Sequence, residues 1–443
     1  MVESPFGDRL PAEDLNDAWR LLDTAERVDG FRLLAPADAH EFFLGLAPPD
    51  QMDLILGLPS NERRLWMRLL APDDAADVIQ SAEESRRGEL TGLLDDSAKR
   101  EVSSLLAYAE DDAGGLMSPR FARVRPELSV DEAITYMRKQ VNEKLETIYY
   151  GYVLDSQQRL RGVVSFRDLF SAKGAAKVAD VMKTDVITVP DTMDQEAVGR
   201  LFAQYDLMAL PVVDADGRMQ GIVTFDDIVQ VVQEEATEDI QKIGGSEALD
   251  APYLEVTLGS MVKKRAGWLV ILFLGETLTA TAMTHFEHEL AAALVLALFI
   301  PLIVSSGGNS GSQATTLVIR AMSLGEVRLK DWWRVMRREL ASGFALGAIL
   351  GVIGFLRIVL WQHFGSDYGP NYLWLGVTIG IALLGVVVWG TLSGAMLPLV
   401  LRRLGFDPAS ASAPLVATLV DVTGLVIYFS AASALYLRVA PAG

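Results

Sequence analysis

The sequence predicts a multidomain protein with four kinds of part: an α-superhelical N-domain, a tandem pair of α/β modules, a long acidic linker helix and a transmembrane domain of five helices. Leucines recur every twelve residues near the start, a longer stretch repeats once, and apolar runs fill the last part. We expect the boundaries at 1–112, 113–176, 177–233, 234–262 and 263–443.

The charge of the chain changes sign along its length. Residues 1–258 carry 26 Lys and Arg against 49 Asp and Glu, a net charge of −23, whereas residues 259–443 carry 13 against 9, a net charge of +4. Such acidity repels nucleic acid and attracts cations. Cysteine is absent, which excludes a thiolate metal site or nucleophile. The start of the chain lacks a basic and apolar signal region, so we expect the acidic part in the cytoplasm.

The N-domain is predicted from its twelve-residue period. Similar phrases such as LAPADAHEFF and LAPPDQMDLI each contain a proline turn, a polar cap and about two helical turns. A short helix of this kind buries its apolar face only against its neighbours, which is typical of a solenoid. The leucines on this grid are Leu10, Leu22, Leu34, Leu46, Leu58 and Leu70.

The repeated stretch predicts two copies of one α/β module, each with a hairpin, around Asp155 in the first and Asp214 in the second. Its closing phrases, GVVSFRDL and GIVTFDDI, resemble those of cystathionine-β-synthase (CBS) domains. The resemblance implies contact with an adenosine nucleotide, with ATP as the candidate, through Ser165, Asp168, Thr224 and Asp227. Many CBS pairs instead bind no nucleotide and serve as a dimerising scaffold.

Five apolar runs, which begin after Lys263–Arg265, are long enough to cross a bilayer. Basic clusters mark one side of the membrane, and the loops HFEHE and QHFGSDYGPN, which lack Lys and Arg, mark the other. The positive-inside rule then places the N-terminus in the cytoplasm and the C-terminus outside the cell, in a multi-pass protein of the inner (plasma) membrane.

Polar groups inside these runs indicate a path for an ion. Asp421 lies near the middle of the last run, where an isolated carboxylate costs about 2.5–3.5 kcal/mol. Glu276 in the first run either lines the same path or caps a helix contact. The run SSGGNSGSQATT lacks the lysine of a phosphate-binding loop. Its glycines favour close helix packing, and we expect Asn309 to face the pore.

The chemistry of this path favours a hard, hydrated cation. Carbonyls, hydroxyls and one carboxylate form an all-oxygen environment, and Mg²⁺ is the cation that loses its water most reluctantly. A two-fold axis that brings two copies of Asp421 together would complete the site. The sequence contains no Ser-His-Asp set, HExxH motif or P-loop for an enzyme, and an anion channel would need basic intramembrane groups.

The order of these parts, together with SSGGNSGSQATTLVIRA and SAPLVATLVDVTGLVIYF, resembles the MgtE family of magnesium channels. The resemblance implies a homodimer with a pore along its axis. It also implies that Asp421 holds hydrated Mg²⁺ with the carbonyl of Ala417, and that Asp407 lies near the cytoplasmic mouth. Ala413 stands where the family pattern has Asn, which keeps a broader divalent transporter for Co²⁺, Mn²⁺ or Ni²⁺ open.

The linker EEATEDIQKIGG resembles the plug helix of that family, which closes the cytoplasmic mouth. Its acids repel one another unless cations intervene. The resemblance implies that cytoplasmic Mg²⁺ bridges such acids and closes the pore. An alternative is that they are solvated surface. The predicted regulatory metal ligands are Asp73, Asp77, Asp194, Glu196, Asp206, Asp227, Glu235, Glu238 and Asp239.

Overall fold

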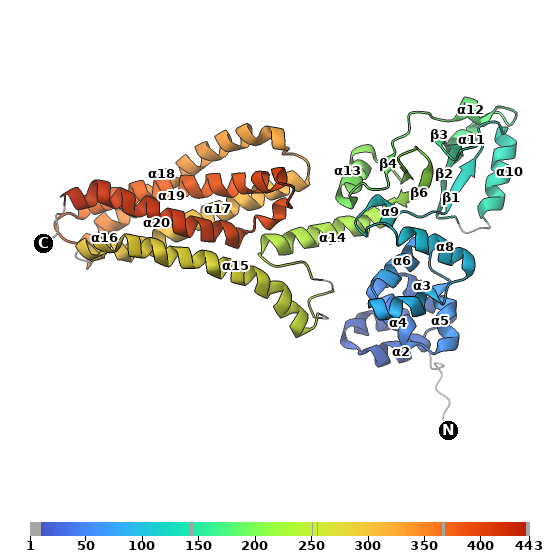
Figure 1. The fold of residues 1–443 in the computed structure, drawn as a ribbon, viewed down its shortest axis with the longest axis horizontal. Coiled ribbons are helices and arrows are strands. Elements are labelled where there is room, and N and C mark those ends of the chain that lie inside the picture. The colour runs from blue at the N-terminus through green and yellow to red at the C-terminus, as the bar shows by residue number, and fades with distance from the viewer. Residues whose placement is uncertain (1–9, 142–144, 250, 255, 366–367, 440–443) are drawn as a thin grey trace, which may run out of the picture. The chain divides into compact units, whose positions relative to one another are not determined.

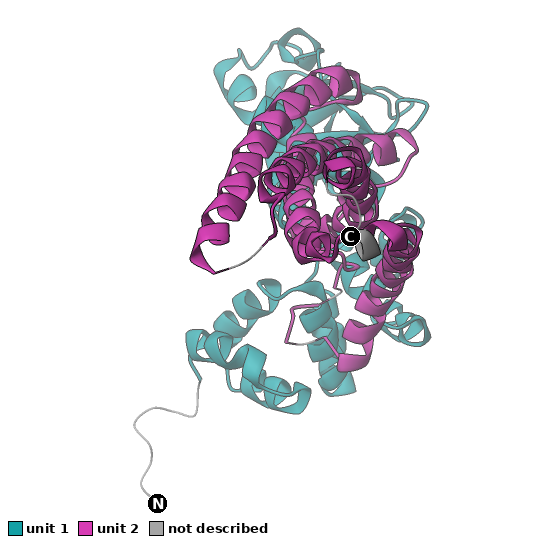
Figure 2. Ribbon diagram, turned by 90° about the vertical axis from the view of Figure 1, so that its left-hand side faces the viewer, with its two compact units in different colours: residues 1–233 teal, residues 234–443 magenta. Residues whose placement is uncertain are grey.

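The computed structural model describes residues 10–141, 145–249, 251–254, 256–365 and 368–439. The first nine residues of the predicted N-domain lie outside this set. The chain divides into two compact units, 1–233 and 234–443, which Figure 2 shows in different colours.

The N-domain is an array of eight short α-helices, as the twelve-residue period predicts (Figure 1). Several begin with proline at the first helical position, where the missing N–H costs no hydrogen bond. Leu34, Leu58 and Leu70 of the repeat are buried in one core. The helices are α1 (Ala12–Ala18), α2 (Thr24–Arg32), α3 (Pro36–Leu44), α4 (Pro48–Gly57), α5 (Ser60–Met67), α6 (Pro72–Gln80), α7 (Glu84–Thr91) and α8 (Asp96–Leu105).

The two α/β modules have the same topology, which confirms the internal repeat. In each sheet the first strand pairs in parallel with the second, and the second pairs antiparallel with the third. The hairpins turn at Asp155 and Asp214, as predicted. The first module contains α9 (Ala113–Leu116), β1 (Phe121–Val124), α10 (Val130–Val141), β2 (Thr147–Leu154), β3 (Leu160–Ser165) and α11 (Phe166–Ser171). The second contains α12 (Val178–Val181), β4 (Val189–Pro190), α13 (Gln195–Tyr205), β5 (Ala209–Val213) and β6 (Met219–Thr224), after which α14 begins.

The linker helix does not have the predicted limits of 234–262. Helix α14 (Phe225–Ile243) is the closing helix of the second module and continues without a break through the acidic segment. It ends before Gly244 and Gly245, and Gly245 has a φ of +76° that favours glycine. The first membrane helix begins at Leu258, where the Thr257 hydroxyl caps it.

Five helices of the second unit are long and apolar enough to cross a membrane, in agreement with the five predicted spans. Helices α17 to α20 pack on one another, and α15 packs against α20 (Figure 1). A short helix, α16 (Glu287–Ala292), follows α15. The bounds are α15 (Leu258–His285), α17 (Ile300–Ser323), which is extended at its start by a 3-10 turn from Leu294, α18 (Trp332–Phe364), α19 (Tyr372–Arg403) and α20 (Ala413–Val439).

Candidate functional site

The polar run in α17 is helical throughout and presents two different faces. On the first face, Ser310 and Thr315 are buried and contact α19, where Thr315 donates a 2.8 Å hydrogen bond to the carbonyl of Gly394. A Cβ built on Gly311 would lie 2.9 Å from the carbonyl oxygen of Gly390, which also belongs to α19. This face therefore serves close helix packing, as its small residues predict.

The second face of α17 is a polar stripe that the described part of the chain leaves exposed. Ser305, Asn309, Gln313 and Thr316 are exposed and recur at helical spacing. Asn309 hydrogen-bonds only weakly within this stripe, with 3.4 Å between its side-chain nitrogen and the Ser305 hydroxyl. Polar groups cannot face hydrocarbon unsatisfied, so this stripe needs water, ions or a second polar surface.

Asp421 lies where α17 and α20 are in contact. A Cβ built on Gly308 would lie 3.6 Å from the Cα of Ala417 and 3.9 Å from the Oδ1 of Asp421. One turn further toward the start of α20, the hydroxyl of Ser312 donates a 3.3 Å hydrogen bond to the carbonyl of Ala413. The structure thus brings Ala417 and Asp421 onto the face of α20 that meets the polar run.

Glu276 of α15 is the second acid at this point. Its carboxyl group lies close enough to that of Asp421 for the two charges to interact. Gly275 permits the approach, because a Cβ there would lie 2.9 Å from the Thr418 methyl group. This position beside Asp421 favours a Glu276 side chain that lines the ion path over one that caps a helix contact.

A second group of acids lies within the first unit, where the N-domain meets the second module. Asp73 of α6 is 7% exposed, and its Oδ1 has no hydrogen-bond partner. Burial raises the pKa of Asp73 well above its ordinary value, and the charges of Glu146 and Asp227 raise it further. The structure thereby brings together two predicted ligands, Asp73 and Asp227. Glu146 was missed by the sequence reasoning, because an acid just before a strand has no distinguishing pattern.

The matching aspartates of the two modules, Asp168 and Asp227, have pKa values shifted in opposite directions. Ser165 and Asp168 cap α11 reciprocally, and the Ser165 hydrogen bond lowers the pKa of Asp168. Thr224 and Asp227 make the same contact, with 2.5 Å between the hydroxyl and the carboxylate. Burial nevertheless raises the pKa of Asp227 to about 7, with further increases from Asp226 and Glu146. Both pairs predicted for nucleotide binding therefore have a local capping role.

The acids at the end of α14 contact other parts of the second unit. The Ser323 hydroxyl of α17 donates to Asp239, and burial and the Asp407 charge raise the pKa of that carboxylate. Lys242 contacts both Glu238 and Asp407, with 2.7 Å to Asp407. Burial alone would lower the pKa of Lys242, but these hydrogen bonds outweigh it and raise the pKa. Lys242 was not predicted as part of this group.

The other predicted ligands lie on α6, on α14 or along α13 and its two ends. Asp194 caps α13 through the amide of Ala197, and Glu196 pairs with Arg200 at 2.8 Å. Asp206 is exposed at the end of α13, while Asp77 and Glu235 are half-buried. Across the described residues, no three Asp, Glu or His side chains converge closely enough to hold an ion by themselves.

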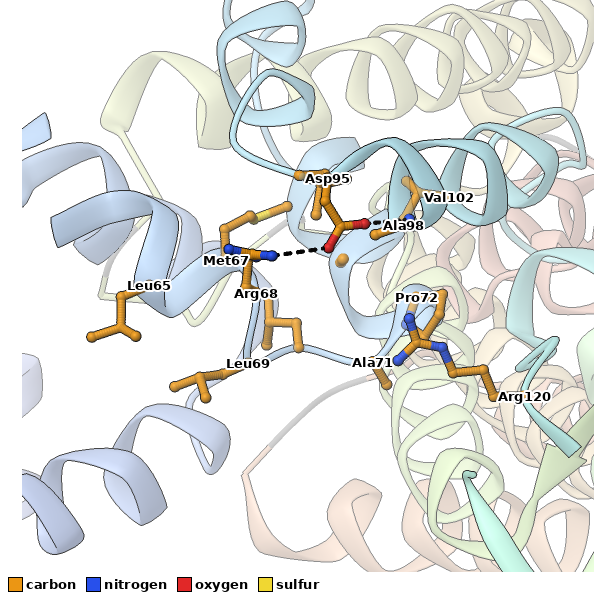
Figure 3. Close-up of a pocket in the computed structure, with 13 residues that line it drawn as sticks. Leu65, Met67, Arg68, Leu69, Ala71, Pro72, Asp95, Ala98, Val102 and Arg120 are labelled. Atoms are coloured by element: carbon orange, nitrogen blue, oxygen red, sulfur yellow. Dashed lines mark hydrogen bonds and ion pairs between the residues drawn. The ribbon is translucent and has the colours of Figure 1, made fainter. Parts of the chain in front are cut away.

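One cavity of about 440 Å³ lies beside α5, α6 and α8 (Figure 3). Arg68 points toward Asp95 there at 3.2 Å, and Arg120 pairs with Glu101 at 2.9 Å. Its lining residues include none of the predicted ligands.

Known protein families match the N-domain, the tandem modules and the membrane helices of this chain. The family model of MgtE, described as a divalent cation transporter, matches residues 300–431. That of the MgtE intracellular N domain matches residues 10–111, and the CBS domain matches residues 113–174 and 178–234. These matches confirm the predicted N-domain and CBS pair, and they indicate a transporter rather than an enzyme.

Individual relatives agree with the family models. The magnesium transporter MgtE of Thermus thermophilus is 43% identical over 363 residues, which cover 81% of this chain and 78% of that protein. The Bacillus subtilis magnesium transporter MgtE is 33% identical and covers 84% of this chain and 80% of that protein. The crystal structure of the cytosolic domain of the Mg²⁺ channel MgtE in complex with ATP is 39% identical, with a TM-score of 0.47, over 50% of this chain and 90% of that one. Because the Thermus thermophilus transporter is 43% identical over 81% of this chain, the chain belongs to the MgtE family of divalent cation transporters.

Proposed function

We propose that the protein carries Mg²⁺ into the cell as a homodimer and that cytoplasmic Mg²⁺ closes it. The observation that carries the transport proposal is the position of Asp421, which faces the polar run of α17 and lies beside Glu276. A hydrated Mg²⁺ keeps several waters and needs few protein carboxylates. The carbonyl of Ala417, on the same face of α20, contributes to this site.

A second copy of the chain supplies the missing side of the path. The stripe that contains Ser305, Asn309, Gln313 and Thr316 is exposed in one chain, although it lies on a membrane helix. A two-fold axis along this stripe would face it with its own copy and enclose a polar passage. The N-terminus lies in the cytoplasm and the C-terminus outside, as the charged loops predict.

Cytoplasmic Mg²⁺ acts at the acids that the structure gathers outside the membrane helices. Asp73 and Asp227 form one regulatory group, and Glu238, Asp239 and Asp407 form another. Mg²⁺ offsets their repulsion and favours the closed arrangement by binding it more tightly than the open one. Asp77, Asp194, Glu196, Asp206 and Glu235 complete the regulatory ligands, and ATP binds at the CBS pair.

The second candidate is a transporter for a broader set of divalent ions, such as Co²⁺, Mn²⁺ or Ni²⁺. Ala413 favours it, because the Ser312 hydroxyl contacts the backbone carbonyl of Ala413 and no side-chain amide stands there to select an ion. Flux into liposomes that contain the purified protein, measured for Mg²⁺, Co²⁺, Mn²⁺ and Ni²⁺ in turn, tests both. Transport of Mg²⁺ at a much higher rate than the others supports the first candidate, and similar rates for all four support the second.

A further inference from the structure

The last turns of α14 contain a cation of their own among the acids. The Nζ of Lys242 lies 2.7 Å from the Oδ2 of Asp407, and it also contacts Glu238 one helical turn earlier. The other oxygen of Asp407 accepts a 2.8 Å hydrogen bond from the amide of Ala409. Both oxygens of Asp407 are therefore committed, and its carboxylate is held in one orientation.

This contact lies where the end of α14 meets the membrane helices. Ile243, the next residue, packs on Ile319, Ala409 and Ala411. A Cβ built on Gly245 would lie 2.8 Å from the Trp268 ring and 3.1 Å from Pro414. Pro414 belongs to the first turn of α20, the helix that carries Asp421. The end of α14 is thus docked beside the cytoplasmic start of that helix.

A cation favours the docking, because three carboxylates lie near one another there. Glu238, Asp239 and Asp407 repel one another, and the side chains of Lys242 and Asp407 are only 28% and 38% exposed, so water screens their interaction incompletely. The ammonium group of Lys242 bridges two of the three. This bridge forms from protein groups alone.

We propose that Lys242 is a positioning residue that holds the end of α14 on the membrane helices without a bound ion, and so sets how much Mg²⁺ is needed to stop transport. The inference rests on the proposed transport and its closure by Mg²⁺. Since Lys242 supplies part of the docking free energy, Mg²⁺ has to supply only the rest. Removal of the lysine shifts the equilibrium toward the undocked arrangement.

The test measures Mg²⁺ flux by the full-length protein in liposomes while Mg²⁺ on the cytoplasmic side is varied. K242Q raises the Mg²⁺ concentration for half-inhibition by about tenfold, the change expected from losing a charge-assisted hydrogen bond. K242R keeps the charge and restores the value toward that of the wild type. K330Q removes the same charge from an exposed lysine of the second unit and leaves the value unchanged. D407N shifts the value as K242Q does, and the double variant shifts it no further.

An unchanged half-inhibition value in K242Q overturns the proposal. A lowered value also overturns it, because the lysine would then compete with Mg²⁺ for the carboxylates. If K242Q fails to assemble, K242M replaces it, and the absence of a shift in that variant contradicts the role of Lys242.

A second measurement separates this inference from the proposed function. Without Mg²⁺, limited proteolysis within residues 244–249 is faster in K242Q than in the wild type, because the docked end of α14 restrains these residues. Equal cleavage rates overturn the role of Lys242. A wild-type protein that shows no Mg²⁺ flux, or no inhibition by Mg²⁺, refutes the proposed function while the cleavage result still tests the lysine contact.

Discussion

The hydroxyl of Ser323, at the end of α17, donates a 2.7 Å hydrogen bond to Asp239 of α14. It joins the acidic segment to the helix that carries Asn309. The carboxylate of Asp239 is half-buried and lies near the charges of Asp407 and Glu238, which raise its pKa in addition to the effect of burial. Asp239 is therefore a group whose negative charge a bound cation would stabilise.

Neutralising these acids is expected to weaken closure by Mg²⁺. In the double variant E238Q/D239N, flux should persist at cytoplasmic Mg²⁺ concentrations that stop the wild type, because the ion has fewer charges to bridge. Patch recordings with varied Mg²⁺ measure this. Ser323→Ala is the matched control, since it removes the hydrogen bond but keeps the charge, and its shift should be smaller. Unchanged closure in the double variant would remove the acidic segment from the gating mechanism.

The Asp73 and Asp227 group predicts an unusual pH dependence. The pKa of Asp227 is raised from 3.8 to about 7, so the folded state binds this proton more tightly than the unfolded chain does. The contribution of Asp227 to the free energy of unfolding therefore falls as pH rises between these two values. Added Mg²⁺ should raise the melting temperature more at pH 8, where the acids are ionised, than at pH 5.

Thermal unfolding of the full-length protein in detergent, with EDTA or with Mg²⁺, measures this dependence. Asp227→Asn should reduce the loss of stability that accompanies the rise in pH. Asp168→Asn is the matched control in the first module, because a hydrogen bond from Ser165 lowers the pKa of Asp168 and its linkage has the opposite sign. Equal pH profiles for the two variants would contradict the buried acidic group.

Gly311 tests the close packing of α17 on α19. A Cβ there would lie 2.7 Å from the Val416 side chain and 2.9 Å from the Gly390 carbonyl oxygen, so α17 would have to move. Gly311→Ala should destabilise the membrane helices by about 1–3 kcal/mol, as overpacking does. Gly259→Ala, where no atom lies within 4 Å of the new Cβ, should leave the melting temperature in detergent nearly unchanged. Equal melting temperatures for the two variants would contradict the packing.

Regular patterns explain why much of the fold could be predicted from the sequence. The twelve-residue leucine period and the repeated module depend on local burial and capping, and both appear in the structure. Helix α14 begins before the predicted linker segment, because nothing in the sequence between Phe225 and Glu234 interrupts a helix. The glycines at 244 and 245 did mark its end, but the prediction continued the segment past them.

The groups at the candidate sites were harder to predict because they depend on contacts between distant segments. Lys242 and Asp407 are 165 residues apart, and no local pattern relates them. Glu146 precedes an ordinary strand. Within the run SSGGNSGSQATT, helical spacing alone did not show which polar groups pack on α19 and which remain uncovered. Asp421 could be identified from the sequence, since a carboxylate in an apolar run is unusual by itself.

Mg²⁺ flux by the Asp421→Ala variant tests the central claim most directly. The purified wild type and variant are placed in liposomes with a Mg²⁺ indicator, and size-exclusion chromatography establishes that both are folded and have the same oligomeric state. Mg²⁺ should enter through the wild type and not above background through the variant. Wild-type rates of Mg²⁺ entry through a folded Asp421→Ala variant would contradict that claim.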